Sequence, residues 1–524
     1  MALGVAGVQP RFEDPRGLLG DRLRGIYRLL ADYGGRIFGD DYFADLYKDS
    51  VKGRPTVPAR VLATVMILQA HEGLSDREAC DRLERDLAWQ AACGVHTAPA
   101  AFHPTVLVGL RNRLRASGRP RRLFVDIRAM AVESGLLGGR ARVLDSTPIY
   151  DSVATQDTVT QLRSAIRKLL RVLDQAYPGV AAKVRAVLAR DDDYAGPGKP
   201  PCDWDDPAAR DGLVDALVGD ARAAVAAVEG EKLEGAAAAA VELLALVAGQ
   251  DVEAGEDGVF RIAVRVATDR IISTVDTEAR HGHKSRNRSF DGFKTHASVD
   301  PDSEIIDEVA VTPANTHDGD AAVVDALLGG HASSEDKPTV FADSAYASAE
   351  SLSRLADAGF DVRAKVPPAV GRDGRFSKDA FAVDTEAGTV TCPAGHTVTV
   401  RFNSEGAGKA DFGGHCGGCP LRDSCTASAS GRTISIHPRE SVLQAAKEKQ
   451  ASPEWKQEYR GTRPKVERKL AHFVRVLWGG RKARVRGTAR IATDVDTRAA
   501  AVNMARLATL GLYHDGTAWA TAPP

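Results

Sequence analysis

Two aspartates stand directly behind short apolar runs that are far apart in the sequence. Asp145 ends the stretch RVLD and Asp343 ends the stretch TVFAD, and a serine follows each of them. Pro148 cannot donate a ladder hydrogen bond, which predicts that the first strand ends within a few residues of Asp145, near an opening of the fold. A lone Asp is more often a turn residue or a helix cap. Because the pattern occurs twice, we expect both carboxylates to meet across a sheet, where they can hold metal ions.

A two-metal site for phosphoryl transfer needs a third acidic ligand, and Glu467 is the candidate. It lies on a predicted helix beside the apolar stripe, with Arg463 one turn earlier, although a surface ion pair would have the same spacing. Two magnesium ions can lower the pKa of an attacking water or 3'-hydroxyl and stabilise the leaving oxygen, so three carboxylates suffice. Oxygen ligands suit magnesium or manganese and disfavour zinc. We therefore predict that Asp145, Asp343 and Glu467 form one site for two magnesium ions.

A second metal site is predicted in a cysteine-rich segment. Four of the seven cysteines lie between 392 and 425, and Cys416 and Cys419 have the spacing of a zinc knuckle. The surrounding segment is Gly-rich and has little apolar sequence for a core, so bound metal would help to fold it. The alternative is reduced free thiols, because the two outer spacings are irregular. We expect one structural zinc on Cys392, Cys416, Cys419 and Cys425, with Cys80, Cys93 and Cys202 in packing or surface positions.

Three histidines, His281, His283 and His317, lie between the two aspartates in the sequence. They could bind metal, contact DNA or support the acidic ligands. Ordinary surface histidines are the commoner case, so we expect contacts with DNA or with the ligands at most.

The order of the predicted elements determines where these side chains lie. A chain of 524 residues is long enough for two or three modules. Residues 1–140 contain apolar residues at helical spacing and a capping box at Ser75 and Glu78, which predicts an all-α N-terminal domain. Its last helix is basic, as in many DNA-binding modules, so we expect this domain to bind DNA. From 141 onward the order is strand, strand, strand, helix, strand, with Asp145 on the first strand and Asp343 on the fourth. This is the order of a ribonuclease H-like mixed sheet in an α/β catalytic domain.

Two insertions interrupt this catalytic domain, which we expect to span 141–512. Residues 153–258 return to apolar residues at steps of three and four and predict a helical insertion. Residues 370–450 are rich in Gly, Ser and Thr with short strand-like runs, and predict a small β insertion that holds the zinc. Residues 513–524 are expected to be a C-terminal tail.

The formal net charge of -1 hides an uneven distribution. Residues 191–257 hold 17 acidic and 4 basic residues, whereas 456–490 hold 12 basic and two acidic ones, and 111–128 hold seven arginines and one acid. Any single basic stretch could be only a solvated helix face. Basic stretches that are separated from an acidic block are together typical of a protein that binds a polyanion.

Composition narrows the class further. With 44% hydrophobic and 27% charged residues the chain is typical of soluble globular proteins, and no window has the apolar length of a membrane span. The first residues lack a basic region followed by an apolar run, so we expect no secretory signal and a cytoplasmic protein. Seven cysteines, an odd number, argue against a disulfide framework.

Several stretches form a further pattern through their order. They are VLDST (143–147), ARHGHKSRNRSFDGFKTHASVD (279–300), VTPANTHDGD (311–320), VFADSAYAS (340–348), the cysteine segment, and RPKVERKLAHFVRVLWGGRKARVRG (463–487). The combination extends over nearly all of residues 50–512. It resembles the DDE transposases of bacterial insertion sequences, closest to the group numbered eleven eighty-two, with an InsH-like N-terminal domain. In related groups two residues separate the Tyr and the Arg of a helix signature, whereas here three residues separate Tyr459 from Arg463. Those groups also have a Lys seven positions after the Glu, and the corresponding position here, seven after Glu467, is Val474.

The resemblance implies that Asp145, Asp343 and Glu467 take the DDE roles with magnesium or manganese, two ions per active site. It implies transposon-end duplex DNA and target DNA as partners, a homodimer on DNA because two ends must be brought together, and a bacterial cytoplasmic protein that lies at the nucleoid when bound. We expect DNA contacts from Arg111, Arg113, Arg115, Lys284, Arg286, Arg288, Lys294, Arg463, Arg475, Arg481, Arg484 and Arg486.

The favoured function is therefore an enzyme of DNA transposition that binds terminal inverted repeats, cleaves at the ends and joins 3'-hydroxyls to target DNA. One alternative is a ribonuclease H-like nuclease that cuts without joining, which the absence of strand-transfer products would reveal. Another is a domesticated DNA-binding protein that has lost catalysis, against which the three intact carboxylates speak.

Overall fold

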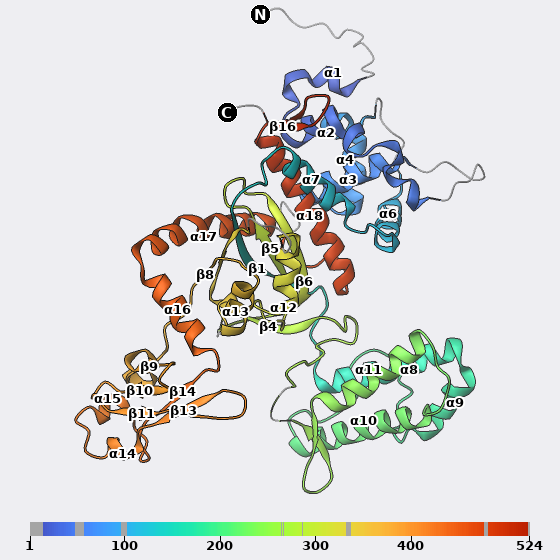
Figure 1. Cartoon of the computed structure of the whole chain (residues 1–524). Helices are drawn as coiled ribbons and strands as arrows, with labels where there is room; N and C mark the ends of the chain where they lie inside the picture. Colours follow the sequence, from blue (N-terminus) through green and yellow to red (C-terminus); the bar gives the residue numbers. More distant parts are fainter. Residues whose placement is uncertain are drawn as a thin grey trace, which may run out of the picture.

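The structure is a computed structural model that describes residues 14–47, 57–95, 102–263, 265, 267–285, 287–331, 337–475 and 480–521. Figure 1 shows a helical N-terminal part, a central sheet flanked by helices, a helical insertion and a small β module. The last long helix returns from the sheet to the N-terminal helices, so the last described strand lies beside the first helices of the chain.

The N-terminal part is a group of helices around a common core. Its middle helix, α3, is buried along nearly its whole length because its residues are apolar all round. The predicted capping box at the start of α4 is confirmed, since the Ser75 backbone N–H donates to the Glu78 carboxylate at 2.7 Å and the Ser75 side chain accepts from the Glu78 N–H. The helices are α1 (Pro15–Leu19), α2 (Gly25–Ile37), α3 (Ala59–Glu72), α4 (Asp76–Arg85), α5 (Leu87–Cys93), α6 (Thr105–Ala116) and α7 (Arg122–Glu133), with 3-10 turns at Gly20–Arg22 and Asp40–Leu46.

The central sheet is mixed, as predicted, and β1 (Ala141–Tyr150) lies in its middle. On one side β1 pairs antiparallel with β5 (Arg288–Val299), whose far edge carries β4 (Arg280–Ser285) and then β6 (Ile306–Pro313), both antiparallel to it. On the other side β1 pairs in parallel with β7 (Thr339–Ala342), and β8 (Val362–Ala364) extends the sheet in parallel. The helix α12 (Ala321–Leu328) connects β6 with β7.

The prediction that β1 ends within a few residues of Asp145 is wrong. β1 continues to Tyr150, and Pro148 pairs with Lys294 of β5 inside the strand. Its parallel pairing with β7 stops at Val143, so Pro148 has a strand partner on one side only, and on the other side β1 forms an isolated bridge from Tyr150 to Lys482. A proline fits there because no ladder hydrogen bond is required on the open side.

Alternating residues of the sheet enter two different cores. Val143 and Phe341 pack on one face into a core that continues through the helices at both ends of the chain. Leu144 and Val340 point to the other face, which is covered by α12 and α13 (Ala349–Asp357). The sheet is therefore buried on both faces in its centre.

Three helices complete the chain after the β module: α16 (Glu440–Ala451), α17 (Pro453–Phe473) and α18 (Thr488–Thr509). α17 packs against β1 and β7, and α18 packs against β6 and also against α2, α3 and α7. Where a C-terminal tail was expected, residues 512–521 form the hairpin β15 (Leu512–His514) and β16 (Trp519–Thr521). Trp519 packs edge-on against Tyr33 of α2, with ring centroids 5.4 Å apart.

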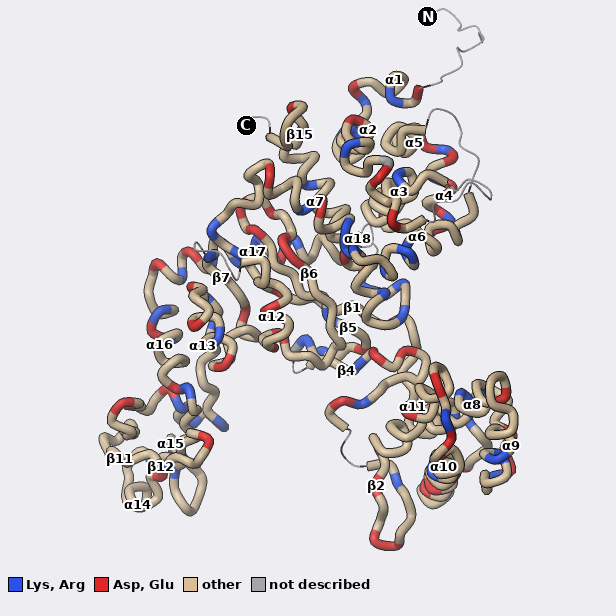
Figure 2. Tube along the Cα trace, turned by 45° about the vertical axis from the view of Figure 1, so that its right-hand side comes forward, with Lys and Arg blue, Asp and Glu red and all other residues tan. Residues whose placement is uncertain are grey.

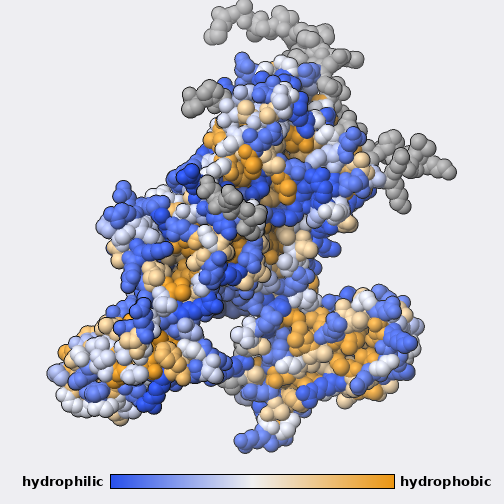
Figure 3. Space-filling model, in the orientation of Figure 1, coloured by the Kyte–Doolittle hydropathy of each residue, from blue (hydrophilic) through white to orange (hydrophobic). Residues whose placement is uncertain are grey.

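The helical insertion has a core of its own. It contains α8 (Thr158–Ala176), α9 (Pro178–Val187), α10 (Pro207–Ala227) and α11 (Ala236–Gln250), followed by a hairpin of β2 (Val252–Ala254) and β3 (Phe260–Ile262). Figure 3 shows hydrophobic residues over much of the insertion on the face in view.

The cysteine-rich segment forms a small β module, which Figure 1 places beyond α16 and away from the sheet. Its two sheets consist of β9 (Ala382–Asp384), β10 (Thr389–Thr391) and β11 (Thr397–Thr399), and of β12 (Arg401–Phe402), β13 (Gly408–Asp411) and β14 (Thr433–Ile436). The short helix α14 (Gly413–Cys416) ends at one cysteine and α15 (Arg422–Cys425) ends at another. Cys419 lies between the two helices. Among the described residues of the whole chain, no helix is long and apolar enough to cross a membrane.

Candidate active site

The three predicted carboxylates line one cavity of about 560 Å³. Asp145 comes from β1, Asp343 from the end of β7 and Glu467 from α17, three segments that are distant in the sequence. The cavity wall also carries four of the cations that the sequence singled out: Lys284, Lys294, Arg463 and Arg481.

The register of the two parallel strands explains why Asp145 and Asp343 are neighbours. Val143 of β1 is level with Phe341 of β7, and each aspartate follows two residues later. β7 ends at Ala342, and Asp343 begins the turn Ser344–Tyr346 by accepting a hydrogen bond from the Ala345 N–H at 2.9 Å. The two carboxylates therefore stand level with each other at the point where the strands separate.

Arg463 lies between these two carboxylates. Its Nη1 is 3.1 Å from Oδ2 of Asp145, and its Nη2 is 3.9 Å from Oδ2 of Asp343. Burial and the neighbouring charge of Asp145 raise the pKa of Asp343, because both effects disfavour a second negative charge. One turn before Arg463, the Tyr459 hydroxyl donates to the Ala342 carbonyl at 2.9 Å and holds the end of β7 against α17.

A fourth acidic residue in the cavity, Asp318, was not singled out from the sequence. Its carboxylate accepts from the Ser146 hydroxyl at 2.6 Å and from the Lys294 ammonium at 2.8 Å. Burial would raise the pKa of Asp318, but Lys294 and His296 outweigh it and lower the pKa. The only sequence signal is that Asp318 lies within the stretch VTPANTHDGD of the resemblance.

The donor chemistry of the Asp145 and Asp343 pair fits a divalent cation. The part of the chain that is described has no group of three or more His, Cys, Asp or Glu side chains close enough together to hold a metal ion. The pair nevertheless offers hard carboxylate oxygens that repel each other, and Arg463 supplies the positive charge between them. Such oxygens are the ligands that magnesium prefers. Glu467 lines the same cavity but does not complete a closely spaced set with them.

The arginines of α6 differ in how much of their charge is free. Arg111 forms an ion pair with Asp76 at 2.8 Å and also donates to Gln69. Arg113 is exposed and lies over the ring of Tyr47 at 4.8 Å, and Arg115 donates to Asn112 of its own helix. Of this predicted DNA-binding group, Arg111 is therefore largely committed to holding the helices together.

The remaining predicted DNA contacts lie mainly around the cavity and α18. Arg481 donates to the Thr147 hydroxyl at 3.0 Å beside Asp145, and Arg484 donates to the carbonyls of Gly73 and Leu74 in the helical part. Arg288, Arg475 and Arg486 are exposed, and Arg286 lies outside the described residues.

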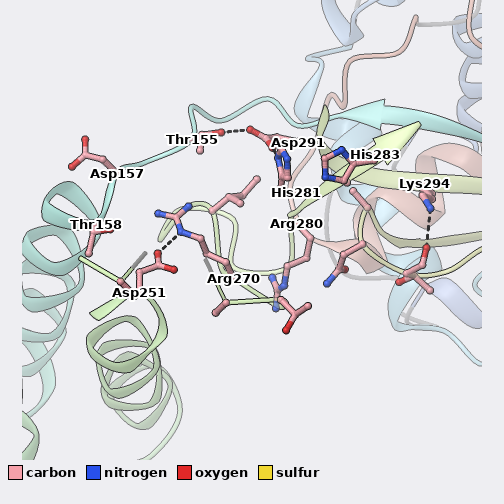
Figure 4. A pocket seen from close by; sticks show the side chains of 18 of the residues that line it. Thr155, Asp157, Thr158, Asp251, Arg270, Arg280, His281, His283, Asp291 and Lys294 are labelled. Atoms are coloured by element: carbon pink, nitrogen blue, oxygen red, sulfur yellow. Dashed lines mark hydrogen bonds and ion pairs between the residues drawn. The ribbon is translucent and has the colours of Figure 1, made fainter. Parts of the chain in front are cut away.

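A second hollow of about 830 Å³ adjoins the cavity and shares His283, Lys294 and His317 with it. Figure 4 shows its side chains, which come from the central sheet and from the segments that lead to the helical insertion. The ring of His281 stands edge-on to that of His283 at 5.0 Å, and its Nδ1 is 2.7 Å from the Asp291 carboxylate. Of the three predicted histidines, His283 and His317 thus line the acidic cavity as well as the second hollow, whereas His281 lines the second hollow.

The four cysteines of the β module line one small cavity of about 20 Å³. They are free thiols, and burial raises the pKa of the Cys425 thiol. The rings of His396 and His415 are stacked at 4.8 Å on the same cavity wall. The set has the donors that a structural zinc takes, although the thiols are not spaced as a closed metal-binding group. Cys80 and Cys93 are buried in the N-terminal part, and Cys202 is half-buried in the insertion.

Two segments of the chain match known families, both of transposases. Residues 391–508 match the transposase DDE domain, and residues 18–113 match a transposase domain (DUF772). These matches support a DDE-type transposase of an insertion element, an enzyme that cleaves DNA. The first match includes Glu467 and the cysteines, whereas Asp145 and Asp343 lie before it. No curated protein and no solved structure matches the chain.

Proposed function

We propose that the protein is a transposase that binds the terminal inverted repeats of its insertion sequence, cleaves at their ends and joins the 3'-hydroxyls to target DNA. The observation that carries this proposal is the common cavity of Asp145, Asp343 and Glu467, with four cations on its wall. Within the DDE transposases, the ordered stretches of the sequence favour the group numbered eleven eighty-two with an InsH-like N-terminal domain.

The proposed fold of the catalytic part is ribonuclease H-like. Support comes from the order of the sheet: a central β1, the antiparallel β5 and β6 on one side, and the parallel β7 and β8 on the other. In this arrangement β1 and β7 are neighbours, and Asp145 and Asp343 lie level with each other just beyond the point where the pairing of the two strands stops. The catalytic domain would span 141–512 with insertions at 153–258 and 370–450, after a DNA-binding domain at 1–140.

In this proposal Asp145, Asp343 and Glu467 would hold two magnesium ions. When bound, such ions activate a water or a 3'-hydroxyl and stabilise the leaving oxygen of the phosphodiester. Tyr459 fixes the end of β7, so that Asp343 stays level with Asp145. Arg463 offsets the charge of the two half-buried carboxylates, and Lys284 and Arg481 add positive charge to a wall that a phosphodiester would face.

The β module would bind one structural zinc through its four cysteines. The shared small cavity and the short strands of the module support this proposal. Zinc there would fold the module and take no part in catalysis, because the module lies beyond α16 and contributes no residue to the acidic cavity.

A cleavage assay tests the proposed function directly. The purified protein would be incubated with magnesium and a duplex of the DNA that flanks its gene, together with a supercoiled target plasmid. The expected products are a cut at the end of the inverted repeat and its 3' end joined to the plasmid, formed by a homodimer on DNA. Cleavage without joined product would favour a nuclease, and specific binding without cleavage would favour a DNA-binding protein that has lost catalysis.

A further inference from the structure

The helical insertion carries a hollow of about 750 Å³ that takes no part in the site described above. One wall is α8, and another is formed by the two linkers that join the insertion to the sheet, at Gln156 and at Thr274. The linkers are fixed to each other, since the Gln156 N–H donates to the Ile272 carbonyl at 2.8 Å and the Gln156 side chain accepts from the Thr274 N–H at 2.8 Å. The hollow therefore has a defined position relative to the active-site sheet.

Cations dominate this hollow even though the insertion as a whole is acidic. Its wall holds Arg167, Lys168, Arg171 and Arg185 against Asp174 and Asp193. Lys and Arg gather on α8 and α9, as Figure 2 shows, whereas α10 carries three Asp against two Arg and α11 carries one Glu. The charge of the insertion is thus separated between its helices.

Two of these cations have neither an ion pair nor a hydrogen bond among the residues that the structure describes. Arg185 is paired with Asp174 at 2.6 Å, and Arg167 donates to the Gly196 carbonyl at 2.9 Å. The side chains of Lys168 and Arg171 make no hydrogen bond or ion pair within the described part of the chain. They stand three residues apart on one face of α8, where like charges repel.

The proximity of Lys168 and Arg171 is electrostatically unfavourable. Burial and the charge of Arg171 both lower the pKa of Lys168, because each disfavours its charged form. A bound anion would relieve this repulsion. Lysine and arginine together are well suited to phosphate, the first as a point charge and the second as a planar pair of donors.

The hollow shown in Figure 4 provides the contrast. Thr155 and Asp157 of the first linker line that hollow, whereas Gln156 lines this one, so the two lie on opposite sides of the linker. In Figure 4 the arginines are already neutralised: Arg270 pairs with Asp251, and Arg280 pairs with Asp269 at 2.7 Å. Among the described residues that line these two hollows, the Lys and Arg side chains without an acidic partner all lie on the α8 side of the linker.

We infer that α8 of the helical insertion is a second DNA-binding surface, at which Lys168 and Arg171 bind the phosphodiester backbone of the duplex that is being processed at the acidic cavity. The inference rests on the proposed function, because the DNA ligand is the substrate of that function. It assigns to the insertion a role in holding DNA, although the net charge of the insertion is negative.

The test compares two double variants of the full-length protein. Lys168→Gln with Arg171→Gln removes two charges from α8, and Arg210→Gln with Lys232→Gln removes two exposed charges elsewhere in the same insertion. Binding of a fluorescent duplex with one inverted repeat and its flanking DNA is measured over a range of salt concentrations. Because each phosphate contact contributes about 0.9 to the slope of log affinity against log salt, the α8 variant should lose about 2 from that slope and about tenfold in affinity at low salt.

The control variant should keep the slope and affinity of the wild type. An unchanged slope in the α8 variant, or an equal change in both variants, would overturn the inference. Arg171→Gln alone, at an exposed position, should lose about 1 from the slope and provides the same test if the double variant does not fold. Failure of the wild-type protein to cleave the same duplex would instead count against the proposed function, since cleavage is read separately from the salt dependence.

Discussion

At the scale of single residues, the acidic cavity is built around a charge conflict. Asp145 and Asp343 are level with each other, and Arg463 is the cation that reaches both. Because the Arg463 side chain is 8% exposed, this contact is largely shielded from solvent. The sequence left open a surface ion pair between Arg463 and Glu467. In the structure Arg463 instead contacts the carboxylates of Asp145 and Asp343.

Glu467→Gln is expected to abolish end cleavage and strand transfer in magnesium while leaving affinity for the transposon end within a few-fold of the wild type. The reason is that the substituted amide would lack the anionic oxygen that magnesium prefers as a ligand, whereas the surrounding cations, which we expect to hold the DNA backbone, are unchanged. Activity assays and a binding titration on the same protein preparation measure the two effects.

Glu458→Gln is the matched control on the same helix. Glu458 pairs with Arg363 outside the cavity, so cleavage should stay close to the wild-type level. Near-normal cleavage by Glu467→Gln would remove Glu467 from the proposed triad.

At the scale of elements, the sequence could single out Asp145 and Asp343, which line one cavity, because an apolar run that ends in Asp is a local signal. The length of β1 was not predictable in the same way. Whether Pro148 ends a strand depends on the neighbouring strand, and β7 stops pairing with β1 at Val143. Asp318 was missed for a related reason: its place in the cavity is set by Ser146 and Lys294, which are distant in the sequence.

The buried carboxylate of Asp307 on β6 ties three elements together. It is 2.6 Å from Arg142 of β1 and 2.6 Å from Arg128 of α7, and it also accepts from His331 at 2.7 Å. Burial would raise the pKa of Asp307, but His331, Arg142 and Arg128 hold it well below its usual range. The ionised carboxylate of Asp307 therefore contributes to the contact between the sheet and the N-terminal helices, beside the ion pair of Arg121 with Glu308 of β6.

Asp307→Asn should destabilise the protein by about 3 kcal/mol at neutral pH, because it removes the buried carboxylate that pairs with Arg128 and with the buried Arg142 and leaves Asp300 as the acidic partner of Arg142. Since the pKa of Asp307 is lowered by folding, its contribution is complete above the unfolded value near 3.9 and is lost as the pH falls below it. The difference in free energy of unfolding between variant and wild type should accordingly narrow below about pH 4. Denaturant unfolding at several pH values measures it, with Asp302→Asn, at an exposed ion pair with Lys465, as a control that should change little.

For the β module we expect about one zinc per chain. Elemental analysis of purified protein measures it, and Cys416→Ser should lower the zinc content because it removes one of four thiolates. Cys202→Ser, in the helical insertion, should leave the zinc content unchanged. A fully folded wild-type protein without zinc would contradict the prediction.

At the scale of the whole molecule, the N-terminal helices and the C-terminal helix form one body. α18 packs against α2, α3, α7 and β6, and one continuous core extends from the N-terminal part into the sheet. The periodicity of a sequence indicates which face of a helix is apolar, but it does not show which distant helix will cover that face. The sequence alone therefore favours a domain boundary at residue 140 and a free C-terminal tail from 513. A chain that begins near 140 would leave the apolar face of α18 uncovered, and point substitutions are the better test of DNA recognition.

The two basic stretches of the sequence also meet in this body. Burial and the nearby charge of Arg490 lower the pKa of Arg115, and Arg484 reaches the loop at Gly73 and Leu74. Figure 2 shows Lys and Arg where α6 and α18 approach each other. Positive charge from both ends of the chain is thereby concentrated on one side of the N-terminal helices, which is the distribution expected for a DNA-binding surface.

Arg113→Gln with Arg115→Gln should therefore weaken binding to the inverted repeat and lower the preference for it over unrelated DNA. Two lost phosphate contacts would reduce the salt slope by about 2, and misplacement of the helix on the repeat would reduce specificity as well. Arg22→Gln with Arg24→Gln removes the same charge from exposed positions of the same helical part but outside the basic stretch, and should leave specificity unchanged. Competition titrations with inverted-repeat and scrambled duplexes measure both quantities.

Because Arg111 is already paired with Asp76, Arg111→Gln should instead lower the melting temperature, which would separate the arginine that holds the fold from the two that we expect to face the DNA. Equal loss of specificity in the Arg22 and Arg24 variant would show that total charge, and not this surface, governs recognition of the transposon end.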